Sequence, residues 1–476
     1  VMMRTLFALL LALTAVQLHA VEPEKDPPVE TPKKKGGDPG LEGFKVTGLP
    51  LISFSTDDGF GYGVRAYGTY YEEGYAPFKF QAFAQYYKTT RGYEYHEVSL
   101  DALKFLGTPL RLRLDGGFER TLNAQWYGYG NYHDLARIKQ IKNGEIPINE
   151  NTPPNTKRDL YQYDQNITLN NLALTNPFGS GNQIFNPSQR VLRESQDKYF
   201  YYDRIRPFIN ISTEDFIGDT NFKWFAGVRG QRYKIQSYQG DYDNGNTVAN
   251  IKTLIDNERP YGYDATQDRK YVNGVRGAIA YDSRPRDRES NPNGGIFTDI
   301  HVEGVGKGTG SHYSFTRTTV TWRQYFDVAP SFFNSFDKEL VIGYRLLGQE
   351  TSGDVPFFEA GRIYTMRESA EGLGGNGGVR GYSANQFVDK DMVIGNLEMR
   401  LTTFKISALG GMDFVLLGYH DEGRVGASRR EIDMDNWHKA NGGGVRIVWQ
   451  KNTIINISYG RSKYGANGNF SFNHLF

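Results

Sequence analysis

The sequence predicts an all-β fold, a 16-stranded antiparallel transmembrane β-barrel, and three observations lead to this prediction. Apolar and polar residues alternate with period two in many segments, as at Leu110, Leu112 and Leu114, and these segments have the roughly ten-residue length of tilted membrane strands. Tyrosine and phenylalanine gather at the segment ends, where the aromatic girdles of a barrel would lie. After the first twenty residues, no apolar run approaches the ~20 residues of a membrane helix.

The N-terminal part of the chain is expected to remain outside the barrel. Arg4, the apolar run 6–16 and Ala20 predict a secretory signal peptide over residues 1–20. Residues 21–45 are rich in Pro, Lys and Glu near their start, and they are predicted to form a flexible periplasmic tail because such a segment cannot bury a core. Residues 46–476 are then expected to form the transmembrane β-barrel as one unit.

Sixteen strands are expected, near residues 50–56, 60–72, 78–89, 93–105, 110–122, 198–212, 220–236, 271–284, 296–307, 312–327, 339–349, 392–405, 411–421, 439–450, 453–462 and 467–476. The connections after the fifth, seventh, eleventh and thirteenth strands are long. Those after the second, fourth, sixth and fourteenth are short. A barrel with its N-terminus in the periplasm sorts its loops and turns in this way.

The first and last strands are expected to meet at a seam that closes the barrel. Pro50 has no backbone donor, so it is expected to begin a short edge strand. The terminal strand carries Phe470, Phe472 and Phe476 on one face, and this ending is similar to the terminal strand of bacterial outer-membrane proteins.

Composition argues against several classes of function. The formal net charge of +1 does not favour nucleic acid as a partner, and the absence of cysteine excludes disulfides and thiolate metal sites. No histidine lies in a catalytic motif, and His420 beside Asp421 is expected to be an interface residue. Residues 241–246 resemble a calcium loop, but Lys252 stands where a bidentate glutamate is required. We therefore expect no enzymatic activity, no metal and no cofactor.

One glycine-rich stretch, LGGNGGVRGYSANQF at residues 373–387, carries a single cation, Arg380. Its Val-Arg-Gly-Tyr segment resembles the signature of the BamA- and TamA-type bacterial surface antigen barrels of the outer-membrane protein eighty-five superfamily. Supporting matches follow in order: WYGYGN at 126–131, DSRPRDRESNPNGG from Asp282, NLEMR around Glu398 and HDEGRVG around Asp421. The resemblance covers about residues 45–476.

The resemblance implies that the sixth extracellular loop folds into the lumen and is held there by its arginine. Strand alternation places Asn396, Glu398 and Arg400 on the inner face of the twelfth expected strand. The residues expected to fix the loop, through a charge-assisted contact, are Val379, Arg380, Gly381, Tyr382, Glu398 and Asp421.

The resemblance also implies a place in the bacterial outer membrane and a role in translocating or inserting protein or lipid through a lateral seam. Assembly members of the superfamily carry POTRA modules, which residues 21–45 are too short to form, so we expect a separate periplasmic partner protein. Outer-membrane lipids would surround the barrel, and outer-membrane proteins or lipids would be its clients. The alternative is a passive pore or structural barrel, and an outer-membrane enzyme is less favoured.

Overall fold

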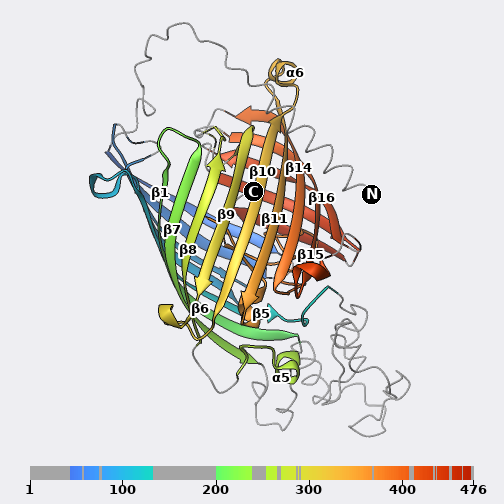
Figure 1. The fold of residues 1–476 in the computed structure, drawn as a ribbon. Helices are drawn as coiled ribbons and strands as arrows, with labels where there is room; N and C mark the ends of the chain where they lie inside the picture. The colour runs from blue at the N-terminus through green and yellow to red at the C-terminus, as the bar shows by residue number, and fades with distance from the viewer. Residues whose placement is uncertain are drawn as a thin grey trace.

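The computed structural model contains a closed barrel of 16 antiparallel strands (Figure 1). It describes residues 43–472, apart from 56–57, 74, 76–77, 132–199, 238–252, 265–269, 286–287, 289–290, 367–368, 407–411, 433–434, 436, 450–452 and 464. None of the helices in this part of the chain has the length and apolar character to cross a membrane. The predicted all-β class is confirmed.

The barrel strands follow one another around the sheet in chain order. They are β1 (Gly43–Ser55), β2 (Gly59–Tyr71), β3 (Phe80–Thr89), β4 (Tyr93–Ala102), β5 (Arg111–Gln125), β6 (Tyr201–Phe216), β7 (Phe222–Ser237), β8 (Lys270–Asp282), β9 (Gly295–Val305), β10 (Phe315–Asp327), β11 (Glu339–Gly353), β14 (Asp391–Ile406), β15 (Met412–Gly426), β16 (His438–Trp449), β17 (Thr453–Ser462) and β18 (Gly465–Phe472). Each expected strand corresponds to one of these.

The remaining elements lie in the connections. A separate two-stranded sheet is formed by β12 (Arg362–Tyr364) and β13 (Ser369–Glu371). The short helices are η1 (Phe105–Gly107), α5 (Leu254–Glu258), η4 (Lys307–Thr309), α6 (Pro330–Asn334), α7 (Phe357–Ala360) and η6 (Arg429–Glu431).

The two ends of the barrel differ in their connections. Helix α6 marks one end, which also carries the short β6–β7 turn and is called the turn end here; α5 marks the opposite end, called the loop end (Figure 1). The long connection from β11 to β14, residues 354–390, leaves the strands at the loop end and contains α7, β12 and β13. This connection is called the lumenal loop below.

Alternation along the strands separates an apolar outer face from a charged inner face. On β14, Met399 is 54% exposed whereas its neighbour Glu398 is fully buried. Ile279 and Ile300 lie on the outer face and are likewise more than half exposed. Apolar side chains at these positions suit contact with lipid, while the inner positions hold polar groups that must find partners inside the barrel.

The first strand is longer than expected. It begins at Gly43 rather than at Pro50, because Phe44 and Val46 continue the outward-facing period-two pattern. A proline lacks one backbone N–H, but it does not end an edge strand when that N–H would have no acceptor on a neighbouring strand. The expected tail over residues 21–45 therefore overlaps β1 by three residues, 43 to 45. The expected signal peptide and the rest of the tail lie outside the described residues.

The barrel closes between β1 and β18 through very little pairing. All 13 residues of β1 are paired with β2. Between β1 and β18, the described residues form one pair, Ser55 with Asn469. Ser55 is the last residue of β1 and lies at the loop end, so the closing contact is at that end of the seam.

Candidate functional site

The lumenal loop occupies the interior of the barrel. Most of its described side chains are buried, including those of Phe357, Phe358, Glu359, Tyr364, Leu373, Val379, Arg380, Tyr382 and Phe387. Among their contacts with the inner wall, three join a charged group of the loop to a charged group of the wall.

The first contact is called the Arg380 anchor and consists of Arg380, Glu398 and Asp421. Asp421 on β15 accepts from Arg380 Nε at 2.7 Å, from Nη2 at 2.8 Å and from the Arg380 backbone N–H at 3.0 Å. Glu398 on β14 accepts from Nη1 at 2.5 Å. Burial alone would lower the pKa of Arg380, but the charges of Asp421 and Glu398 raise it above its usual value, so the guanidinium stays charged.

Neutral groups complete the surroundings of Arg380. Its guanidinium carbon lies 3.6 Å from the ring centre of Tyr419, which is a cation–π contact. Asn396 donates to Asp421 and to the Gly378 carbonyl, both at 2.8 Å. The loop backbone is therefore held by the same wall side chain that orients the carboxylate.

Glu398 also serves two arginines of the wall. Its Oε2 accepts from Arg400 Nε at 2.8 Å and from Arg446 Nη2 at 3.4 Å, while Oε1 accepts from Arg380. Three arginines thus share one fully buried carboxylate, and Asp421 supplies the second negative charge. Arg380 makes most of its hydrogen bonds with Asp421, whereas Arg400 and Arg446 bind Glu398.

Glycines allow the loop to reach the wall. Gly381 has φ +102°, and an added Cβ would meet the Ala440 side chain at 3.1 Å and the Gly460 backbone at 3.2 Å. A Cβ added at Gly460 would in turn meet Gly381 N at 2.9 Å. Both the positive φ and the backbone contact require residues without side chains at this point.

Tyr382 extends the contact toward the last strands. Its hydroxyl donates to the Lys439 carbonyl on β16 at 3.2 Å, and its carbonyl accepts from Asn467 Nδ2 on β18 at 3.2 Å. Val379, fully buried, packs in an apolar cluster with Tyr382 and Phe387. Residues 379–382 therefore touch the wall from β14 to β18.

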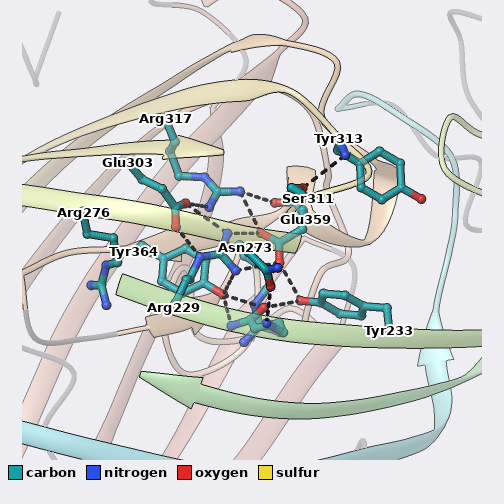
Figure 2. A network of polar contacts seen from close by, with 12 residues as sticks. Arg229, Tyr233, Asn273, Arg276, Glu303, Ser311, Tyr313, Arg317, Glu359 and Tyr364 are labelled. Atoms are coloured by element: carbon teal, nitrogen blue, oxygen red, sulfur yellow. Dashed lines mark hydrogen bonds and ion pairs between the residues drawn. The ribbon is translucent and has the colours of Figure 1, made fainter. Parts of the chain in front are cut away.

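The second contact is called the Glu359 anchor and consists of Glu359, Arg229, Glu303 and Arg317 (Figure 2). Arg229 on β7 donates to Glu359 Oε1 at 3.2 Å and Oε2 at 3.1 Å. Arg317 on β10 donates to Glu359 Oε2 at 3.2 Å and to the Glu359 carbonyl at 2.7 Å. Both arginines also bond Glu303 on β9, and all four side chains are fully buried.

Two tyrosines complete the Glu359 anchor. Tyr233 donates to Glu359 Oε1 at 2.6 Å, and the Tyr364 ring lies 4.5 Å from the Arg229 guanidinium carbon. Burial by itself would raise the pKa of Glu359, but the charges of Arg229 and Arg317 outweigh it and hold this pKa well below its usual range. Glu359 is therefore an ionised carboxylate in a buried site.

The third contact lies on β5 and β6. Glu371 of the loop accepts from Arg204 on β6, and Asn385 of the loop donates to it at 2.9 Å. Arg204 also donates to Glu119 on β5 at 2.9 Å, and Arg362 donates to Glu371 at 3.4 Å. The loop thus bridges walls on different sides of the barrel.

Aromatic residues, among them Trp126 and Phe357, form a cluster at the loop end of the barrel. Trp126 contacts Phe357 of the lumenal loop edge to face, with ring centres 5.1 Å apart, and its Nε1 donates to Glu258 of α5 at 2.8 Å. Asn131 exchanges two hydrogen bonds with the Val425 backbone of β15. The WYGYGN segment therefore ties the lumenal loop to its neighbours at the loop end.

The other predicted positions are placed as follows. Pro50 is exposed in the middle of β1, and Phe470 and Phe472 pair with Ile457 and Ile455 of β17. Phe476 and the calcium-like segment 241–246 lie outside the described residues. His420 contacts Asn441 rather than Asp421, with Nδ1 2.7 Å from Oδ1. Within the described part of the chain, no group of His, Asp and Glu side chains is arranged to hold a metal ion.

Sequence reasoning missed the Glu359 anchor. Glu359 is the one acid in the apolar segment VPFFEAG, and Arg229, Glu303 and Arg317 interrupt strands at inward-facing positions. Charges at inward positions of neighbouring strands, together with an isolated acid in an apolar loop, were the available signal. Their pairing could not be read from spacing, because Arg229 and Glu359 are 130 residues apart.

Comparison with known proteins gives a family and several similar folds. The model of the Omp85 superfamily domain matches residues 215–473. A search of curated proteins finds no match. BamA from Haemophilus ducreyi lacking POTRA domains 1–3 is similar in structure, with a TM-score of 0.51 at 11% identity over 91% of this chain and 70% of that one.

Two CdiB structures are also similar. CdiB from Escherichia coli gives a TM-score of 0.49 at 7% identity, over 89% of this chain and 62% of that chain. CdiB from Acinetobacter baumannii gives 0.44 at 12% identity, over 91% of this chain and 60% of that chain. The chain thus spans less than two thirds of either CdiB chain.

Proposed function

Because the chain belongs to the Omp85 superfamily, whose barrels translocate or insert proteins at the bacterial outer membrane, we propose that it passes clients through a lateral opening between β1 and β18. The protein lies in the bacterial outer membrane. The clients would be outer-membrane proteins or lipids, and the path would run beside the lumenal loop rather than through the centre of the barrel.

The observation that carries this proposal is the contrast between the seam and the lumen. The lumenal loop is fixed to the wall by two sets of buried charges and by the partly exposed Arg204–Glu371 pair, and removing one partner of a buried pair typically costs about 3–5 kcal/mol. The described residues of β1 and β18 form one pair, which corresponds to about one or two hydrogen bonds of about 1 kcal/mol each. Opening the seam is therefore far less costly than removing the loop.

A disulfide across the seam tests the proposal. The sequence has no cysteine, so Ser55→Cys with Asn469→Cys introduces a single thiol pair at the position where the described residues of β1 and β18 pair. We expect the reduced variant in lipid vesicles to speed the folding of a urea-denatured outer-membrane protein, followed by its heat-modifiable gel migration. Oxidation should slow that folding, because a disulfide between β1 and β18 limits how far the two strands can separate along the seam.

The matched control keeps one of the two cysteines. Ser458 pairs with Asn469 within the β17–β18 hairpin, so Ser458→Cys with Asn469→Cys joins two strands that do not border the seam. The oxidised control should remain active. An oxidised seam variant that speeds folding as well as the reduced variant would overturn the proposal.

We further propose a separate periplasmic partner protein that delivers the clients. The motive is that the described residues contain only the barrel and its connections, with no POTRA-like module. The Pro- and Lys-rich segment 21–40 is the proposed contact. Its deletion should abolish activity and leave a heat-modifiable barrel, whereas unchanged activity would make the segment a spacer.

A passive pore is the second candidate, and one observation favours it. Arg65, Gln85 and Glu97 on β2, β3 and β4 have inward-facing side chains that are only half-buried, unlike the covered wall of β7 to β10. Stable conductance steps in a planar bilayer, unaffected by oxidation of the seam disulfide, would support the pore.

A further inference from the structure

We propose that Asn467 is a positioning residue that pins the loop end of β18 to the lumenal loop, so that the seam opens from its turn end and pivots at Asn467. This inference rests on the proposed lateral opening and identifies where that opening starts. Asn467 lies two positions before Asn469, the residue of β18 that pairs with β1.

The contact joins the last strand to a fixed point. Asn467 Nδ2 donates to the Tyr382 carbonyl at 3.2 Å, and the same oxygen accepts from the Gly375 backbone N–H at 2.9 Å. Tyr382 is itself nearly fully buried and is held to β16 through its hydroxyl. The acceptor therefore cannot follow β18 if that strand moves.

Two buried anchors hold the part of the lumenal loop that precedes this acceptor. Arg380 lies two residues before Tyr382 and makes three side-chain bonds to Asp421 and Glu398. Earlier in the loop, Glu359 is bound by Arg229 and Arg317 on the wall at β7 and β10 (Figure 2). A displacement of β18 that pulls on the lumenal loop is therefore resisted by the strands that hold its two anchors.

The position of the contact along β18 sets the direction of opening. β18 runs from Gly465 at the loop end toward Phe472, and β1 runs the opposite way, ending at Ser55. Asn467 and the Ser55–Asn469 pair both lie near the start of β18. In the described part of β18, the residues after Asn469 pair with β17 only, so the seam is fixed at one end and open toward the other.

Disulfide formation in the variant that combines Ser55→Cys with Asn469→Cys measures the pin directly, without any client. In full-length protein in lipid nanodiscs, adding Asn467→Ala to this variant should slow the reaction by about threefold to tenfold, the ratio expected for the loss of one hydrogen bond. Asn467→Gln keeps the amide donor and should react more nearly at the parent rate. Asn456→Ala removes an inward-facing amide on β17 that bonds Ser458 and should leave the rate unchanged.

Hydrogen exchange in the parent protein gives a second test that needs no folded variant. Backbone amides near Asn467 should exchange about tenfold more slowly than those near Phe472, since a pinned segment opens less often. Uniform exchange along β18 would overturn the proposal, as would an Asn467→Ala variant that forms the disulfide at the parent rate. If both tests give the expected results but the protein does not speed the folding of clients, the proposed function alone is contradicted.

Discussion

At Arg380 the lumenal loop brings a cation to carboxylates of the wall, whereas at Glu359 it brings a carboxylate to arginines of the wall. The two anchors are built from the same groups with the roles of loop and wall exchanged. Arg380 placed against Arg229 and Arg317 would be repelled, and so would Glu359 against Glu398 and Asp421. The opposite signs therefore specify one seating of the loop in addition to stabilising it.

The anchors also differ in what remains when the loop group is removed. Without Arg380, Asp421 keeps only neutral donors among its described contacts, because Arg400 and Arg446 bind Glu398 instead. Without Glu359, both Arg229 and Arg317 keep Glu303. The Arg380 anchor should therefore be the more sensitive of the two.

The largest effect is expected for Arg380→Ala. It leaves a buried carboxylate without a cation and should lower the free energy of unfolding by about 3–5 kcal/mol. Arg380→Lys should also fail, because an ammonium cannot present a planar fork to two carboxylates. Urea titration followed by heat-modifiable migration measures both, with the exposed Arg430→Ala as control. A parent-like Arg380→Ala would remove the basis of the comparison.

Glu359→Gln should have the next largest effect, about 2–3 kcal/mol, because one arginine charge is then uncompensated in a buried site. Adding Arg317→Met restores one cation to one anion, Arg229 with Glu303, and should recover part of the loss. The same urea titrations measure this double-mutant cycle. Strictly additive losses would show that the two residues do not act as a pair.

Acid should loosen the Glu359 anchor. The pKa of Glu359 is depressed in the folded protein from a reference value of 4.5, so its stabilisation is fully present above that pH and is lost as the pH falls below it. The pKa of Arg380 is raised above its usual value by Asp421 and Glu398 despite burial, so the charge on that side chain persists throughout. Stability of the parent should fall more steeply below pH 4.5 than stability of Glu359→Gln, and parallel pH profiles would contradict this.

The smallest effect is expected for Tyr364→Phe. The phenyl ring keeps its position near the Arg229 guanidinium, and only the hydroxyl that accepts from Arg229 and Gln231 is lost. The free energy of unfolding should drop by about 1 kcal/mol. Tyr364→Leu removes the ring as well and should cost more in the same measurement; equal losses would leave the ring without a role.

Much of the fold was predictable because period-two alternation is a local signal. The strand order and the inner face of β14 followed from it, as did the expectation that Glu398 points inward. The prediction of the first strand was wrong at its start, because Pro50 lacks a backbone donor but does not end the strand, and the alternation continues back to Phe44. Phe44 and Val46 were the residues that could have corrected it.

The candidate site was predictable only where a motif marked it. The resemblance of residues 379–382 to a known signature suggested Glu398 and Asp421 as partners of Arg380. No motif marks Glu359, and its partners come from β7, β9 and β10, which lie far away in the sequence. The Asn467 contact with a backbone carbonyl is equally invisible, because it depends on how the loop is seated.

The seating of the lumenal loop has a consequence for the order of folding. The charged groups of this loop meet β6, β7 and β10 on one side and β14 and β15 on the other, so we expect the loop to be in place before the barrel closes. We expect the sheet to form around the loop, with each ion pair forming as its strand is added. β1 and β18 would then pair last, and the loop would act as the support that sets the curvature of the sheet.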